Sequence, residues 1–166
     1  MTTTDDEEFL RVVAHHEAGH VVADHLLGVE VSQVLVDPAH GGRTDVEGWD
    51  DVDVDGLSSE QRKQRLEPAM ISLLAGPFAE ERYAGEFDPQ LAAADLHEVA
   101  ALGFECVDRL DEWPAYEAEL SARANAIVTD TWHDIKLLAG ELERRRTMDS
   151  TDLQAWFEQN PIGGER

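Results

Sequence analysis

The chain has 166 residues, and its 36 acidic residues against 13 Lys and Arg give a formal net charge of −23 at pH 7. A surface this acidic repels nucleic-acid phosphates and anionic membranes, so we expect neither as a partner. No run of 18 apolar residues is present for a transmembrane helix, and the single Cys106 excludes an internal disulfide and a cysteine-based zinc site.

The length predicts one domain with a sizeable core. We expect an acidic tail at residues 1–8, a single domain over 9–160 and a second tail at 161–166. The acidic start lacks the basic and apolar regions of a signal peptide, which indicates a cytoplasmic protein. Two origins of the acidity stay open: a high-salt cytoplasm, where salt screens repulsion between carboxylates, and a GC-rich genome.

The first predicted element is a helix over residues 9–28, where apolar residues recur at helical spacing until Gly28. Residues 29–36 are β-branched and partly alternating, which predicts a strand, and residues 43–49 predict a return strand after a turn. Residues 50–56 hold four aspartates, but the order of an EF-hand and its distal glutamate are missing. We therefore expect a solvated acidic loop there rather than a calcium site.

Four helices are predicted after this loop, over residues 59–84, 88–110, 114–146 and 150–157. Residues typical of helix N-caps precede or open three of them: Ser58 or Ser59, Asp88, and Ser150 or Thr151. Pro68 and Pro77 predict a kink or a split in the first helix, and Gly140 is a weak point in the third. The fold is thus predicted to be mainly α (α+β), with one small β-hairpin directly after the first helix.

Residues 16–20 read His-Glu-Ala-Gly-His, an HExxH motif inside the first predicted helix. On a helix His16 and His20 share one face, so both imidazoles are able to reach a single Zn²⁺. Glu17 is then placed to act as general base on a zinc-bound water. Gly19 costs about 1 kcal/mol in a helix relative to Ala, which predicts a close approach of another segment to the backbone.

A catalytic zinc site needs a third protein ligand and an open position for water. The candidates are four carboxylates and one histidine farther along the chain: Asp95, Glu80, Glu81, His97 and Glu98. Asp95 has small neighbours that permit close packing on the HExxH helix, but the residues alone leave the alternatives open. His15 points about 100° away from the motif face and is not expected to bind the metal. Asp24 is expected either to hold an imidazole by its free N–H or to lie on a solvated face.

Residues 14–22, Ala-His-His-Glu-Ala-Gly-His-Val-Val, resemble the active-site helix of the FtsH-type peptidases, peptidase family M41. The resemblance continues through the strand at 31–36 and through Leu-Leu-Ala-Gly-Pro-Phe-Ala-Glu-Glu at 73–81. It then reaches the Asp-Leu pair at 95–96 and Leu-Leu-Ala at 137–139. These segments follow the order of the family with similar separations, and together they cover nearly the whole chain.

This resemblance implies zinc bound by His16, His20 and Asp95, with Glu17 as the catalytic base. It implies a helical zincin-like peptidase domain, in which the strand after the active-site helix, residues 29–36, is an edge strand that binds the substrate in extended form. The activity implied is that of a zinc metalloendopeptidase. Its substrates would be peptides or unfolded protein segments, and folded proteins would require a separate ATPase or unfoldase.

The chain departs from the family in several places. It contains no counterpart of the ATPase domain or the membrane anchors, and Pro77 replaces the family's Arg after Ala-Gly. The family's Thr-x-Gly-Ala-Ser-x-Asp loop is replaced by Pro-Gln-Leu-Ala-Ala-Ala-Asp at 89–95, which predicts a straighter helix and affects the position of Asp95. Two further functions therefore stay open: a non-catalytic M41-like binding or regulatory module, and a regulatory HExxH peptidase that cuts one partner protein.

Overall fold

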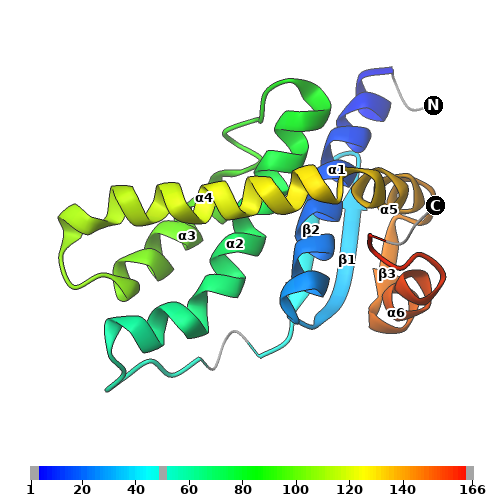
Figure 1. The fold of residues 1–166 in the computed structure, drawn as a ribbon. Helices are drawn as coiled ribbons and strands as arrows, with labels where there is room; N and C mark the ends of the chain where they lie inside the picture. Colours follow the sequence, from blue (N-terminus) through cyan, green and yellow to red (C-terminus); the bar gives the residue numbers. More distant parts are fainter. Residues whose placement is uncertain (1–3, 49–51, 164–166) are drawn as a thin grey trace.

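The computed structural model describes residues 4–48 and 52–163, and all structural statements concern these residues (Figure 1). In chain order the elements are α1 (Thr4–Leu27), β1 (Val31–Asp37), β2 (Gly41–Val46), α2 (Ser59–Ala84), α3 (Ala93–Cys106), the 3-10 turn η1 (Leu110–Glu112), α4 (Trp113–Asp130), α5 (Trp132–Arg145), β3 (Thr147–Asp149) and α6 (Ser150–Gln159). The predicted fold class, mainly α with a small β component, is confirmed. None of the described helices combines the length and the apolar character needed to cross a membrane.

Helix α1 lies at the centre of the fold, where it contacts α2, α5 and the first two strands. It begins at Thr4, so residues 4–8 belong to the helix and not to the predicted tail. Every residue from 13 to 24 is buried, which marks a core helix enclosed on all sides. A Cβ atom on Gly19 would lie 2.7 Å from the carbonyl oxygen of Ala75, so the predicted close approach to the backbone is confirmed.

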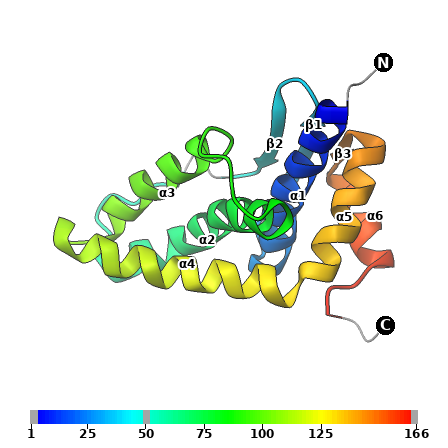
Figure 2. The same cartoon turned by 90° about the horizontal axis from the view of Figure 1, so that it is seen from above.

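The packing divides into two groups around α1 and α2 (Figure 2). One hydrophobic cluster joins α1 to the sheet, α5, α6 and the second half of α2. The other joins the first half of α2 to α3 and α4. Helix α2 therefore belongs to both clusters and holds them together, and its contact with α1 positions the HExxH motif.

The sheet has three antiparallel strands in the order β2-β1-β3. The predicted hairpin of β1 and β2 is confirmed, but β3 was not predicted because three residues are too short for a periodic pattern. Since Val34 pairs with Thr44 on one side and Met148 on the other, β1 is the central strand. The expectation of β1 as an edge strand is wrong, and among the described residues β2 is the edge instead. The predicted return strand ends at Val46; residues 49–51, its end and the start of the acidic loop, lie outside the described residues.

Helix α2 is opened by Ser58, whose side chain accepts the backbone N–H of Gln61 in a capping box. It continues through Pro68 and Pro77, so the predicted split does not occur. It ends at Gly85, whose φ of 89° is the left-handed conformation that glycine adopts without strain.

The predicted helix over 88–110 is shorter than expected. Residues 88–92 form a turn, in which the Asp88 side chain accepts the backbone N–H of Gln90, and α3 starts only at Ala93. The predicted helix over 114–146 is broken at Thr131, not at Gly140, and α5 turns away from α4 at that point (Figure 2).

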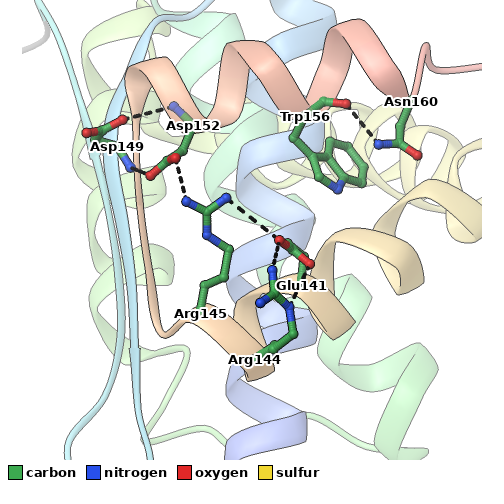
Figure 3. Close-up of polar contacts among 7 residues, drawn as sticks. All are labelled: Glu141, Arg144, Arg145, Asp149, Asp152, Trp156 and Asn160. Carbon is green, nitrogen blue, oxygen red and sulfur yellow. Dashed lines mark hydrogen bonds and ion pairs between the residues drawn. The ribbon is translucent and has the colours of Figure 1, made fainter.

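Polar contacts fix the reversal from α5 through β3 to α6 (Figure 3). Asp149 caps α6 together with Asp152, one residue before the predicted Ser150. Arg145 on α5 forms ion pairs with Glu141 and with Asp152 and so joins the two helices. This reversal brings β3 against β1 and makes β1 the central strand.

Candidate metal centre

Three potential ligands from two distant segments meet in the structure. The Oδ2 atom of Asp95 lies 2.9 Å from Nε2 of His16 and 3.5 Å from Nε2 of His20. The two histidines come from successive turns of α1, whereas Asp95 lies in the first turn of α3. One ligand atom from each residue lies within 4.8 Å of the others, a spacing that suits a single metal ion.

The position of Asp95 depends on the turn before α3. The predicted continuous helix would have shifted Asp95, but the turn at 88–92 remains and α3 begins two residues before the aspartate. Ala92 is fully buried, so the chain packs closely where α3 begins. Of the alternative ligands, Glu81, His97 and Glu98 are exposed and lie outside the group around His16.

Each imidazole is held through its second ring nitrogen. The Nδ1 atom of His16 lies 2.8 Å from Oε2 of Glu80, and Nδ1 of His20 lies 2.9 Å from the backbone oxygen of Ser72. Such partners orient a metal-binding histidine and set which nitrogen carries the proton. Glu80 was considered as a ligand, but the structure places it behind His16 as a positioning residue. The sequence places Glu80 in the family-like segment without indicating this contact.

The electrostatics of the group favour a bound positive charge. Burial lowers the pKa of both imidazoles, but nearby carboxylates outweigh burial. Asp95 and Glu80 raise the pKa of His16, and Asp95 raises the pKa of His20 to about 10. Burial raises the pKa of Asp95, yet the two imidazoles hold it well below its usual range. Two imidazole nitrogens and one carboxylate oxygen are also a donor set that zinc prefers. The residues present therefore fit a zinc ion.

Glu17 lies beside this group under the edge strand. The residue is 4 % exposed, and its carboxyl accepts a hydrogen bond of 2.7 Å from the hydroxyl of Thr44 on β2. A Cβ atom on Gly42 would lie 2.4 Å from Oε1 of Glu17, so the strand passes directly over the carboxyl. Burial raises the pKa of Glu17, which makes its carboxylate a stronger base.

Gly76 is a site residue whose role was not recognised from the sequence. A Cβ atom there would lie 2.3 Å from Nε2 of His20 and 2.9 Å from Nε2 of His16. The backbone of α2 therefore touches the potential ligand atoms, and any side chain would displace them. The cost of glycine inside a helix was the available signal, as it was for Gly19.

A cavity of about 490 Å³ opens in front of these residues. The three potential ligands and Glu17 form one part of its lining, and β2 contributes Gly42, Arg43 and Thr44. Apolar side chains from the connection before α2, from α2 and from α3 form much of the remainder, among them Val54, Leu66, Leu73 and Leu102.

Two other polar residues of α1 were considered at the sequence level. His15 stacks on Tyr83 with ring centroids 3.9 Å apart, and it lies outside the group of potential ligands as expected. Asp24 is buried and hydrogen-bonds with the Ser72 hydroxyl, so it neither lies on a solvated face nor holds an imidazole. Burial raises its pKa to about 6.

A comparison with models of protein families found no match to this chain, and a comparison with curated proteins found none either. The likeness to the FtsH-type peptidases therefore depends on the residues and motifs quoted above.

Proposed function

We propose that the protein is an FtsH-like (M41-like) zinc metalloendopeptidase that hydrolyses peptide bonds in extended or unfolded segments. The observation that carries this proposal is the convergence of His16, His20 and Asp95 beside the buried carboxyl of Glu17. Two histidines and one carboxylate are a ligand set of catalytic zinc sites, in which a further position stays open.

In this proposal each protein residue has a role that its position supports. Zinc would supply Lewis acidity, which polarises a carbonyl group and lowers the pKa of water toward about 7. Glu17 would take a proton from the attacking water and pass it to the leaving amine. The Thr44 hydroxyl orients this carboxyl, while Glu80 and the Ser72 carbonyl orient the imidazoles.

The arrangement of β2 supports an extended substrate. One edge of β2 is unpaired among the described residues, and the strand lines the cavity beside Glu17. A peptide that adds to this edge would lie next to the potential metal ligands, held by backbone hydrogen bonds that do not depend on its sequence. In this proposal β2 takes the role that the sequence assigned to β1.

The same proposal covers partners and location. We place the protein in the cytoplasm, with peptides or unfolded chains as substrates and without nucleic-acid or membrane partners. A chain with a net charge of −23 repels nucleic acids and anionic membranes. Folded proteins do not fit a cavity of about 490 Å³, so their degradation would depend on a separate ATPase or unfoldase.

The decisive experiment compares the wild type with Glu17→Gln. Both purified proteins are analysed for zinc and then incubated with unfolded casein at pH 7–8, in low and molar salt, with and without a chelator. We expect about one zinc per chain in both proteins and chelator-sensitive cleavage by the wild type alone, because the amide cannot accept a proton. Equal cleavage by both would contradict the proposal. Zinc without cleavage at any salt would favour the binding module, and one defined cut in one partner would favour the regulatory peptidase.

A further inference from the structure

The cavity extends beyond the potential metal ligands. Asp24 lines it as well, and this residue follows His20 by one turn of α1. Four residues of helix correspond to about 6 Å along its axis. Asp24 therefore lies about one helical turn from the group that contains His16, His20 and Asp95, and the part of the cavity that it lines is here called the Asp24 pocket.

The cavity that Asp24 lines has a largely apolar wall. Its apolar residues come from the end of β2, the connection before α2, α2 and α3, and they include Val46, Val54, Leu66, Ala69 and Leu73. Asp24 is only 2 % exposed. Its side chain has the Ser72 hydroxyl as a neutral partner, and no Lys or Arg of the described residues forms an ion pair with it. Arg43, which also lines the cavity, pairs with Asp45 at 3.0 Å.

A buried carboxylate without a cationic partner is costly, and a ligand that supplies the cation removes the cost. The walls suit a hydrocarbon stem, and Asp24 suits a positive group at the end of that stem. Lys and Arg side chains have this construction. An apolar side chain of equal length would fill the pocket but leave Asp24 buried without a cationic partner.

The surroundings favour the same ligands. Glu98 and Glu105 on α3 also line the cavity, and the chain as a whole carries a net charge of −23. Such a field raises the local concentration of cationic peptides and speeds their association.

We propose that the Asp24 pocket selects a Lys or Arg side chain of the peptide substrate, with Asp24 as the residue that binds its cationic head. This inference rests on the proposed peptidase function and specifies its substrates: basic extended segments. An alternative role exists for Asp24, because the Ser72 hydroxyl also lies 3.3 Å from the backbone oxygen of His20. Asp24 would then act only as a positioning residue for that histidine, and the test has to separate the two roles.

The test measures binding without requiring catalysis. Zinc-loaded Glu17→Gln protein is titrated against four fluorescent Ala/Gly peptides that differ only at one central residue: Lys, Arg, norleucine or Glu. We expect the Lys and Arg peptides to bind at least about tenfold more tightly than the norleucine peptide, as a charge-assisted hydrogen bond implies. The Glu peptide should bind most weakly.

Two further variants are made in the Glu17→Gln background. Asp24→Asn keeps the shape of the side chain and removes its charge, and it should bring the Lys and norleucine affinities to within about threefold of each other. Glu30→Gln removes one charge from an exposed position outside this cavity. It should leave the ratio of the Lys and norleucine affinities unchanged.

Several results would overturn the inference. Norleucine and Lys peptides of equal affinity would refute a basic specificity but leave the peptidase proposal intact. If Asp24→Asn lowers the affinity for all four peptides equally and also weakens zinc binding, Asp24 acts only as a positioning residue. Failure of all four peptides to bind would also refute it, and cleavage of casein by the wild type then decides separately whether the peptidase function survives.

Discussion

The Nδ1 atom of His16 lies 2.8 Å from Oε2 of Glu80, and both side chains are almost completely buried. The other carboxylate oxygen of Glu80 accepts the backbone N–H of Asp88, at the start of the turn that leads to Asp95. One side chain of α2 therefore connects a potential ligand on α1 with the segment that positions the potential ligand on α3. Substitution of Glu80 should therefore affect zinc binding through both segments.

Glu80→Gln should weaken zinc binding by about tenfold to a hundredfold, because partners of metal-bound histidines contribute on this scale. The imidazole N–H and the Asp88 N–H contact different oxygens of Glu80, and the amide replaces one of these oxygens by an NH2 group that cannot accept a hydrogen bond. Competition with a chromophoric chelator measures the affinity. Glu81→Gln, an exposed neighbour, is the matched control and should bind zinc like the wild type. Equal zinc affinities in the wild type and both variants would show that Glu80 does not support metal binding.

His20→Ala should abolish stoichiometric zinc, because a potential ligand is lost. The wild type should contain about one zinc per chain, measured by elemental analysis of the purified protein. His15→Ala is the adjacent control, since His15 stacks on Tyr83 and lies outside the ligand group. Full zinc occupancy in His20→Ala would refute the metal centre.

Gly76→Ala should disrupt the site through a single methyl group. The added Cβ would lie 2.3 Å from Nε2 of His20, so the imidazole has to move and zinc binding should fall by at least about tenfold. Gly140→Ala is the same substitution at an exposed position of helix α5, where a Cβ meets nothing within 4 Å. It should keep zinc and raise the stability by up to about 1 kcal/mol. The prediction fails if both variants bind zinc equally well.

Asp24→Asn should stabilise the metal-free protein above pH 6. Burial raises the pKa of Asp24 from 3.8 to about 6, so the folded state binds this proton more tightly than the unfolded state. Ionisation above pH 6 then costs stability, by about 1–3 kcal/mol, and the cost disappears as the pH falls from 6 to 4. Urea unfolding at several pH values measures the difference between variant and wild type. A difference that stays constant from pH 4 to pH 8 would contradict this prediction.

Most of the secondary structure was predictable from the sequence, because its signals are local. Apolar periodicity located α1 and α2, and Ser58 and Gly85 mark the ends of α2 within a few residues of its apolar pattern. The β-branched run after Gly28 indicated the hairpin. Predictions failed where local signals are weak. Asp88 resembles an N-cap, but its side chain accepts a hydrogen bond within a turn, and the helix ends at Thr131 although the helical sequence pattern continues across it.

The candidate site divides in the same way. The spacing of His16, Glu17 and His20 sets their arrangement on one helix, so the sequence alone determined this part of the site. Asp95 was one of five candidates on the residues alone, and its small neighbours together with the resemblance favoured it. Its approach to His16 depends on the packing of α3 against the rest of the fold.

The tertiary structure alone decided the remaining features. Glu80 lies 64 positions from His16, Gly76 touches imidazoles on another helix, and β3 makes β1 central from more than a hundred residues away. The proposed specificity role of Asp24 depends on its burial and on the apolar residues that line the same cavity, and neither is apparent from the sequence. Periodicity and capping report on residues within one or two turns, whereas contacts between distant segments depend on how whole elements pack. The sequence therefore determined which helix carries the two histidines and Glu17, and the packing decided what surrounds them.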